Sequence, residues 1–544
     1  MRTGGQILVE CLEAQGVDRV FCVPGESFLA VLDALFDSPI RTVGTRHEGG
    51  AAMMADAEGK MTGRPGVAFV TRGPGATNAA AGVHIARQDS TPMVLFVGQI
   101  GRRMRGRDAF QEVDYRQTFR DLAKWVDEID HADRIPEVIS HAWHLAMSGR
   151  PGPVVLALPE DMLRETPDAA AADQVNVAAP APSPEDIAAF GKLLTAAERP
   201  FMVLGGSRWR RGDKARVEAF SAAWGLPAGC SFRRQYLFDN LHPNYAGDVG
   251  LGINPALKKR IAESDLLLLL GARFSENPSQ GFSLIDIPGP QMKLVHVHPG
   301  AEELGRIYNA ALEINATPGE FLAAAAGLPA RSRSTNAHDD YRAWSDTPPY
   351  GPGAVKMSAV MEHLRATLPD DAIMTNGAGN YAIWLHRFWR YRHFDGQLSP
   401  TSGSMGYGLP AAIAAKLRKP EREVICLAGD GCFQMTGQEF GTAVQEGANV
   451  VVLVVDNGIY GTIRMHQEKK YPGRISATDL RNPDFAALAR AHGGHGETVE
   501  VQEDFAPALA RARAAGKPAL VHLKTDAEAI TPAATLAGLR SGNS

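Results

Sequence analysis

Two neighbouring stretches decide the fold: VICLAGDGCFQM, residues 424–435, and VVVLVVDNGIYG, residues 450–461. Each begins as a continuous apolar run and ends on oxygen-bearing side chains, Asp430 in the first and Asp456-Asn457 in the second. Continuous apolar runs bounded by turn residues are typical of strands buried on both faces of a parallel sheet. Side chains that directly follow such strands lie at the carboxyl edge of the sheet, where α/β proteins bind their ligands.

The same alternation of apolar run, Gly-containing turn and helix-like segment recurs along the whole chain. Examples lie at 66–86, 92–99, 200–213, 265–274, 293–299, 371–384, 423–431 and 449–458. Strands that alternate with helices indicate parallel sheets covered on both faces. The sequence therefore predicts an α/β fold with three doubly wound parallel-sheet domains.

Two stretches interrupt this alternation and are interpreted as linkers. Residues 166–186 are rich in Ala and Pro, and residues 331–353 are polar and end in a Pro/Gly cluster. They predict domains at 1–166, 187–330 and 352–544, each of ordinary domain size.

Composition narrows the class of protein. The chain has 544 residues, 44% hydrophobic and 22% charged, with a formal net charge of −5, which is typical of a folded globular protein and argues against a general nucleic-acid or membrane-surface binder. Its five cysteines form no CxxC pair, so we expect neither a disulfide framework nor a zinc site. The N-terminus does not have the pattern of a signal peptide and no apolar run approaches the roughly 18–20 residues of a membrane span. We expect a cytoplasmic protein.

The two strand ends predict a metal and phosphate site. A right-handed strand–helix–strand crossover would bring Asn457 to the same edge as Asp430, 27 residues earlier. The glycines that flank Asp430 allow close approach of a ligand, and a helix beginning near Cys432 and returning by about Glu446 would direct free N–H groups toward it. A carboxylate, an amide oxygen and a backbone carbonyl form the kind of incomplete oxygen shell that Mg²⁺ completes with diphosphate and water. The alternative is that Gly-Asp-Gly is an ordinary turn.

Several motifs in the same order resemble those of one enzyme family. Besides GDG followed by Asn, they are RHEGGAAMMADAEGKMTGRPGVAFVTRGPGATN (46–78), DAFQEVD (108–114), GARF (271–274) and GSMGYGLPAAIAA (403–415). Together they are similar to the acetohydroxyacid synthase and pyruvate oxidase group of thiamine diphosphate enzymes, across essentially the whole chain. The resemblance implies a pyrimidine-binding, a central and a diphosphate-binding domain. It also implies at least a homodimer, with the cofactor between the first domain of one subunit and the third of another.

The resemblance assigns roles in the predicted third domain. It implies that Asp430, Asn457 and the carbonyl of Ile459 bind Mg²⁺. It places the cofactor against Ala378, Gly379, Asn380, Gly403, Met405, Gly429, Gly431, Cys432, Tyr460 and Gly461. Met405 matches the apolar residue that holds the cofactor bent, although a methionine in such a position also suits an ordinary core.

In the predicted first domain the resemblance implies that Glu48 activates the cofactor through its pyrimidine ring. Pro74, Asn78 and Gln111 match the neighbours of the reacting centre. The local sequence alone favours a solvated charge in a polar turn at Glu48. We interpret the preceding His47 as structural.

Three departures from the family pattern bear on the substrate. Glu26 replaces the second Gly after Pro-Gly and resembles the acid that relays protons in simple 2-oxo acid decarboxylases, but a surface turn explains it as well. His466 replaces a substrate-selecting Trp, and a structural place is its alternative. The segment SENPSQ (275–280) replaces an acidic pair after GARF, which leaves FAD open as a second cofactor.

These observations favour decarboxylation of a pyruvate-like 2-oxo acid, with transfer of the two-carbon fragment to an acceptor carbonyl. The alternatives are a decarboxylase that does not form C–C bonds, an acyl-CoA-handling lyase, a Rossmann-type dehydrogenase and a catalytically silent relative. Dimer versus tetramer and a separate regulatory subunit are left open. The arginines of GRRMRGRD (101–108) are interpreted as a solvated face or an anion site.

Overall fold

The computed structural model describes residues 2–542 and contains three six-stranded sheets whose paired strands all run parallel. This confirms the predicted fold class. Contacts divide the chain into two compact units. Within the described residues the first comprises 2–178, 409–420 and 434–449, and the second comprises 179–408, 421–433 and 450–542.

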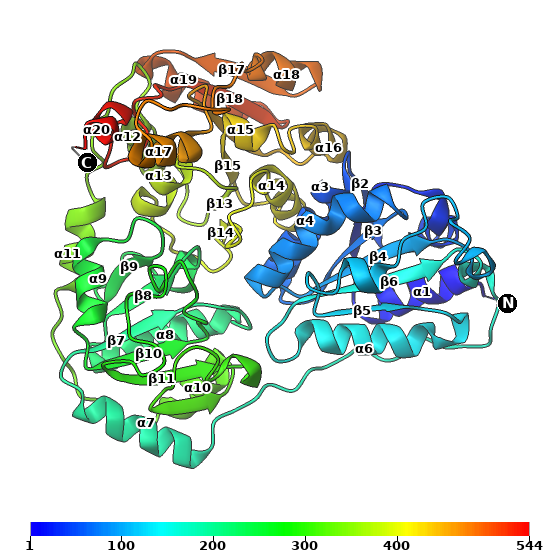
Figure 1. Ribbon diagram of the computed structural model, residues 1–544, viewed down its shortest axis with the longest axis horizontal. Coiled ribbons are helices and arrows are strands. Elements are labelled where there is room, and N and C mark those ends of the chain that lie inside the picture. Colours follow the sequence, from blue (N-terminus) through cyan, green and yellow to red (C-terminus); the bar gives the residue numbers. More distant parts are fainter. Residues whose placement is uncertain (1, 543–544) are drawn as a thin grey trace. The chain divides into compact units, whose positions relative to one another are not determined.

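The first unit contains one sheet with the strand order β2-β1-β3-β4-β6-β5. Its strands are β1 (Arg19–Cys22), β2 (Arg41–Gly44), β3 (Gly66–Val70), β4 (Met93–Gln99), β5 (Trp125–Glu128) and β6 (Pro153–Pro159). Its helices are α1 (Gly4–Ala14), α2 (Leu29–Phe36), α3 (Glu48–Thr62), α4 (Pro74–Asp89), α5 (Tyr115–Thr118), α6 (Ile135–Met147), α14 (Gly408–Arg418, from Leu409 on) and α16 (Glu439–Glu446). Helices α1 and α6 pack together on one face of the sheet, and α3 and α4 pack together on the other (Figure 1).

The second unit contains the other two sheets. The second sheet has the order β12-β11-β10-β7-β8-β9. Its strands are β7 (Pro200–Leu204), β8 (Ala228–Ser231), β9 (Tyr245–Val249), β10 (Leu266–Leu270), β11 (Lys293–His298) and β12 (Leu312–Asn315). Its helices are α7 (Pro184–Ala196), α8 (Arg211–Trp224), α9 (Pro255–Ala262), α10 (Pro318–Ala325) and α11 (Ala337–Ser345).

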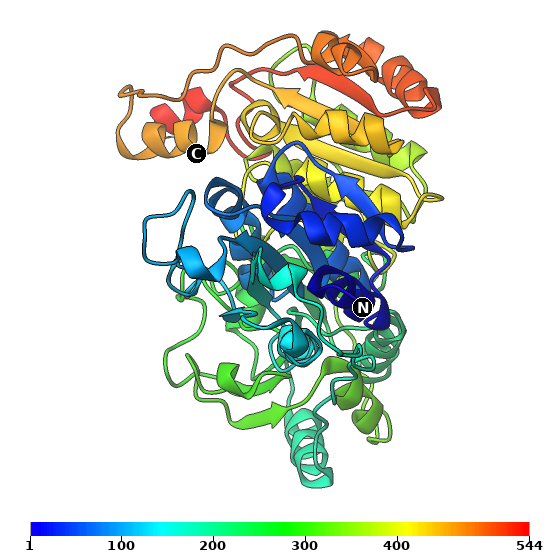
Figure 2. The same cartoon turned by 90° about the vertical axis from the view of Figure 1, so that its right-hand side faces the viewer.

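The third sheet has the order β14-β13-β15-β16-β18-β17 and is covered by helices on both faces (Figures 1 and 2). Its strands are β13 (Ile373–Asn376), β14 (Gln397–Leu398), β15 (Val424–Gly429), β16 (Val451–Asp456), β17 (His495–Val499) and β18 (Ala519–Lys524). The helices of this part are α12 (Met357–Thr367), α13 (Tyr381–Phe388), α15 (Asp430–Phe433), α17 (Gly461–Lys470), α18 (Phe485–Ala491), α19 (Phe505–Ala514) and α20 (Leu536–Arg540).

The central strands of the third sheet are buried along their whole length, which explains their unbroken apolar sequences. Their register fixes the carboxyl edge. Gly429 of β15 pairs with Val455 of β16, and Asp456 pairs with Lys524 of β18. Asp430 and Asp456 therefore reach the same edge at the same level.

Two local predictions were wrong. The second predicted linker contains helix α11, whose Ala337 and Tyr341 are buried, and Tyr341 packs edge-on against Tyr245 with ring centroids 4.8 Å apart. Ala337 and Tyr341 are one helical turn apart, but the polar residues around them conceal this spacing in the sequence. The single helix expected from about Cys432 to Glu446 is instead the short α15 and a separate α16, with Gly437 in the turn between them.

The five cysteines are all buried and unpaired, as expected. Within residues 2–542, none of the helices combines the length and the apolar character that a membrane span requires. The predicted domain boundaries stay predictions.

The close packing of α3 and α4 provides a test of the fold. A Cβ at Gly82 of α4 would lie 2.3 Å from Ala52 Cβ of α3, whereas a Cβ at Gly212 of α8 would meet nothing within 4 Å. Both changes to Ala favour the helix intrinsically, so their difference isolates the steric clash. We expect Gly82→Ala to destabilise the first unit by about 1–3 kcal/mol and Gly212→Ala to leave stability unchanged or slightly higher, measured by thermal unfolding. Equal melting temperatures would contradict the packing.

Candidate functional site

The second unit contains a cavity of about 420 Å³ at the carboxyl edge of the third sheet. All the residues predicted to bind the cofactor or metal in the third domain line it: Ala378, Gly379, Asn380, Gly403, Met405, Gly429, Asp430, Gly431, Cys432, Asn457, Ile459, Tyr460 and Gly461. They come from four separate segments of the chain. The fold thus gathers in one cavity what the sequence shows only as scattered motifs.

Glycines in the cavity wall are required by close contacts. A Cβ at Gly429 would lie 2.7 Å from the Tyr381 ring, and one at Gly431 would lie 2.6 Å from the Tyr460 ring. A Cβ at Gly377 would lie 2.5 Å from Cys432 Sγ. Any side chain at these positions would displace its neighbour, so the glycines are required by the packing of Tyr381, Tyr460 and Cys432 around the cavity.

Asp430 carries the features of a metal ligand. Its Oδ1 accepts a hydrogen bond from the backbone N–H of Gly431 (2.8 Å), and its Oδ2 accepts one from that of Gly458 (2.9 Å). Burial raises the pKa of its carboxyl, and the neighbouring charge of Asp456 adds to this. A divalent cation would favour the ionised form and offset that cost.

Asn457 follows Asp456 in the chain and lines the same cavity as Asp430. Its Oδ1 accepts a hydrogen bond from the backbone N–H of Ile459 at 3.3 Å. Within residues 2–542 no group of three or more His, Cys, Asp and Glu side chains could hold a metal. The predicted shell differs from such a group because it combines one carboxylate with an amide and a carbonyl oxygen.

Asp456 is the nearest acidic neighbour of the site. Its Oδ2 lies 2.7 Å from both His522 Nε2 and Lys524 Nζ, and its Oδ1 lies 2.7 Å from Asn482 Nδ2. Burial alone would raise its pKa, but these hydrogen bonds hold the pKa of Asp456 well below the usual range. The contribution of Asn482 was not predicted. The sequence shows only its position before a Pro at the start of a helix, which is an ordinary capping signal.

In the first unit Glu48 is the first residue of α3, and His47 caps this helix by accepting a hydrogen bond from the N–H of Gly49. His47 is thus structural, as interpreted from the sequence. Glu48 Oε2 accepts a hydrogen bond from Asn78 Nδ2 at 3.0 Å, and a Cβ at Gly75 would lie 3.3 Å from Glu48 Oε1. The structure brings two of the predicted residues into direct contact.

Gln111 lies against the turn that precedes α4. A Cβ at Gly73 would lie 2.9 Å from Gln111 Cβ, and Gly73 itself has a positive φ of 58°. The N–H of Gly73 donates a hydrogen bond to the hydroxyl of Tyr115 at 2.8 Å. Pro74 follows as the first residue of α4. Gln111 and Pro74 therefore flank one turn, next to the helix that carries Asn78.

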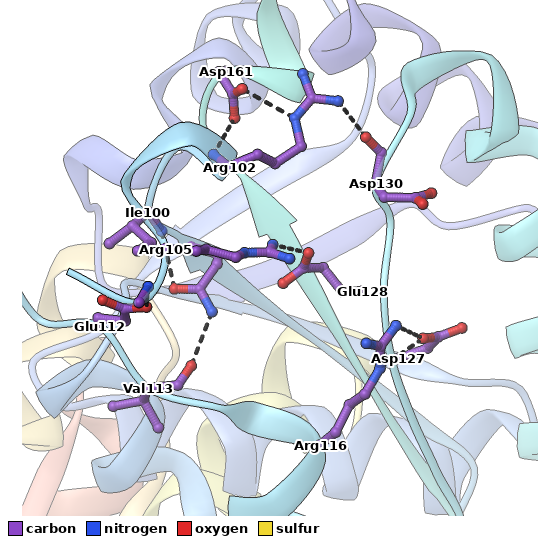
Figure 3. Close-up of polar contacts among 12 residues, drawn as sticks. Ile100, Arg102, Arg105, Glu112, Val113, Arg116, Asp127, Glu128, Asp130 and Asp161 are labelled. Atoms are coloured by element: carbon purple, nitrogen blue, oxygen red, sulfur yellow. Dashed lines mark hydrogen bonds and ion pairs between the residues drawn. The ribbon is translucent and has the colours of Figure 1, made fainter. Parts of the chain in front are cut away.

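Ion pairs fix the loop that carries Gln111 (Figure 3). Arg102 pairs with Asp161 at 3.0 Å, Arg105 pairs with Glu128, and Arg116 pairs with Asp127 at 2.6 Å. For Arg102 and Arg105 the structure therefore favours a structural role over an anion site.

The same loop is tied down by amide and carboxylate side chains. Gln99 donates from Nε2 to the carbonyl of Val113 and accepts from the N–H of Ile100, both at 2.9 Å (Figure 3). Glu112 accepts from the N–H groups of Gly106 and Ala109. The loop is thus held at both ends around Gln111.

The two substrate-related candidates have different surroundings. Glu26 accepts a hydrogen bond from Arg72 Nη2 at 2.7 Å, and 68% of its side chain is exposed. Arg72 is buried and also lies 3.4 Å from Glu160. His466 is exposed on α17 and is not among the residues that line the cavity.

Two buried titratable residues also line the cavity, Asp248 of β9 and His386 of α13. Asp248 Oδ1 and His386 Nε2 are inaccessible to solvent and have no hydrogen-bond partner. Burial raises the pKa of Asp248 to about 7 and lowers that of His386 well below its usual range.

Comparisons with known proteins agree with this arrangement. Three family models match: the N-terminal TPP binding domain of thiamine pyrophosphate enzymes at residues 2–118, the central domain at 187–325, and the C-terminal TPP binding domain at 377–523. These matches contradict the dehydrogenase hypothesis.

Curated relatives extend over most of the chain. An acetolactate synthase of Mycobacterium bovis is 34% identical over 94% of this chain and 86% of that protein. The acetolactate synthase isozyme 2 large subunit of Escherichia coli is 30% identical over 96% of this chain and 95% of that protein. The acetolactate synthase large subunit of Corynebacterium glutamicum is 32% identical over 94% of this chain and 84% of that protein.

The raised pKa of Asp248 has a measurable consequence. Because this pKa is about 7 in the folded protein and about 4 in an unfolded chain, the folded state binds the proton more tightly between these values. Stability due to this group is therefore present at low pH and is lost as the pH rises toward 7. We expect the melting temperature of Asp248→Asn, relative to the unmodified protein, to increase from pH 5 to pH 8. The exposed Asp339→Asn serves as the control, and a difference that does not change with pH would contradict the assignment.

Proposed function

The chain belongs to the thiamine pyrophosphate enzyme family, and we propose on this premise that it decarboxylates a pyruvate-like 2-oxo acid and transfers the two-carbon fragment to an acceptor carbonyl. The family and the relatives support a thiamine diphosphate-dependent carboligase or decarboxylase similar to acetolactate synthase. The observation that carries the proposal is the single cavity in which the predicted diphosphate and metal residues meet.

The residues around this cavity fit a diphosphate and its metal ion. The wall at Gly429 and Gly431 tolerates no side chain, and Asp430 is a buried carboxylate that gains from a neighbouring cation. We propose that Asp430, Asn457 and the carbonyl of Ile459 hold Mg²⁺, the ion that prefers such oxygen ligands and retains phosphate and water. The other lining residues predicted from the sequence would contact the cofactor.

The bound cofactor would supply a carbon nucleophile for the 2-oxo acid carbonyl. The chain's own contribution begins with Glu48, which we propose hydrogen-bonds the pyrimidine ring and exchanges a proton with it. Asn78 holds the Glu48 carboxylate at 3.0 Å, and Pro74 and Gln111 shape the space beside it. Met405, which lines the cavity, would pack against the cofactor and hold it bent. In this proposal Glu48 acts from one subunit on the cofactor of another, so the active protein is a homodimer or a larger assembly.

Glu26 is proposed to act on the substrate side, held by Arg72 at 2.7 Å. Because it is largely exposed at the carboxyl edge of the first sheet, it is available to exchange a proton with a ligand there. We propose that His466 also acts on the substrate. The proposal for His466 rests on the family resemblance, since this residue does not line the cavity.

A second cofactor, FAD, is proposed from the family resemblance, in which the segment GARF (271–274) of the central domain is present. Flavin absorbance bands in the spectrum of the purified protein would support FAD. The absence of these bands would contradict it.

The reaction itself is tested by incubating the purified protein with pyruvate, thiamine diphosphate and Mg²⁺ and identifying the products. Acetolactate would support carboligation, whereas free acetaldehyde alone would favour a decarboxylase without C–C bond formation. Turnover only with an added acyl-CoA acceptor or donor would favour the lyase. No consumption of any 2-oxo acid would contradict the proposal.

Glu48→Gln tests the activating role. The amide keeps the size of the side chain but cannot exchange a proton, so we expect turnover to fall by about 10²–10⁴-fold with cofactor binding retained, measured by steady-state rates and by cofactor titration. Glu13→Gln, at an exposed position of α1, is the control. Unchanged turnover of Glu48→Gln would refute the assignment.

A further inference from the structure

The two carboxylates at the edge of the third sheet differ in how many of their oxygen lone pairs are already used. A carboxylate has about four acceptor positions, two on each oxygen. Asp456 Oδ1 accepts from Asn482 Nδ2 (2.7 Å) and, at 3.1 Å, from the single N–H of Gly458, which it shares with Asp430 Oδ2. Its Oδ2 accepts from His522 and Lys524 at 2.7 Å each. Asp456 therefore has a donor at each of its four acceptor positions, one of them shared with Asp430.

Asp430 has one acceptor position left. Its Oδ2 accepts from Gly458 N at 2.9 Å and from Asn482 Nδ2 at 2.7 Å. Its Oδ1 accepts only from Gly431 N, at 2.8 Å. The remaining lone pair is thus on Oδ1, and Asp430 lines the cavity.

Asn482 is the residue that joins the two carboxylates. Its single Nδ2 group contacts Oδ2 of Asp430 and Oδ1 of Asp456, each at 2.7 Å, and an amide nitrogen has one hydrogen for each. Without this bridge two buried carboxylates would lie side by side. Only the backbone N–H groups of Gly431 and Gly458 would then orient the Asp430 carboxylate, and one acceptor position of its Oδ2 would be open.

Lys524 and His522 complete the arrangement from β18. Of the two carboxylates they contact Asp456, and the strand register places Lys524 opposite it. The Lys524 ammonium balances the charge of Asp456, so the negative charge of Asp430 is the one that faces the cavity. The edge thus presents one carboxylate charge instead of two.

We propose that Asn482 is a positioning residue that, anchored on Asp456, occupies Oδ2 of Asp430 and leaves Oδ1 as the single metal-binding oxygen. This inference rests on the proposed metal site and adds which oxygen binds and what orients it. Neighbours of ligating carboxylates that hydrogen-bond them in this way typically change metal affinity by 10–100-fold.

The test is a calorimetric titration of Mg²⁺ into the full-length protein, freed of metal by a chelator and supplied with thiamine diphosphate. We expect Asn482→Ala to raise the Mg²⁺ dissociation constant at least tenfold, and the loss of two hydrogen bonds to buried carboxylates to lower the melting temperature without metal. Asn482→Ser retains one donor, so its Mg²⁺ dissociation constant should lie between those of the unmodified protein and the alanine variant. The serine variant also provides the test if the alanine variant does not fold. Saturating Mg²⁺ should restore most of the turnover.

A matched control is Asn315→Ala. This side chain also donates from Nδ2 to two acceptors, the carbonyls of His298 and Pro299, but it lies at the end of β12. Its removal should leave the Mg²⁺ dissociation constant unchanged.

The outcomes distinguish a failure of the proposed metal site from a failure of the positioning role of Asn482. If the unmodified protein binds Mg²⁺ and both Asn482 variants bind it equally well, the positioning role is overturned and the metal site stands. If the unmodified protein binds no Mg²⁺ with thiamine diphosphate present, the metal site and the inference both fail. A loss of affinity in Asn315→Ala equal to that in Asn482→Ala would overturn the positioning role as well.

Discussion

The register of three parallel strands, β15, β16 and β18, is the constraint on which the site depends. Gly429 pairs with Val455, and Asp456 pairs with Lys524. A shift of one residue would turn every side chain of the shifted strand to the opposite face of the sheet. The buried apolar residues of these strands would then meet the wrong neighbours, so the core that holds the register also places Asp430, Asp456 and Lys524 side by side.

The sequence was sufficient for the features that depend on local pattern. Apolar runs that end in polar side chains predicted three parallel sheets and the edge at which Asp430 and Asn457 meet. It was insufficient where a contact joins distant segments through ordinary residues. Asn482 lies 52 residues after Asp430 and has no sequence context that separates a bridging amide from a helix cap. Helix α11 was missed for a related reason, since its buried Tyr341 packs on Tyr245, almost a hundred residues earlier.

The two aspartates show why a carboxylate near a cavity is not by itself a metal ligand. Both are buried, and both lie at the carboxyl end of a strand: Asp430 follows β15 and Asp456 is the last residue of β16. What distinguishes them is the number of donors around each, because a lone pair engaged by an N–H is no longer available to a cation. Sequence motifs identify the residue, whereas the donors that decide its chemistry come from other strands and loops.

The first unit shows the same principle with charges in place of lone pairs. Its arginine-rich segment suggested an anion site, yet Arg102 and Arg105 are engaged by acidic side chains around the loop of Gln111. Arg72 is likewise engaged, and the carboxylate that it holds, Glu26, is the exposed partner. These three arginines therefore support the surrounding structure, and Glu26 is the member of its ion pair that is open to a ligand. As with the two aspartates, the partners that decide which charge is available come from distant parts of the chain, because Arg72 lies 46 residues after Glu26.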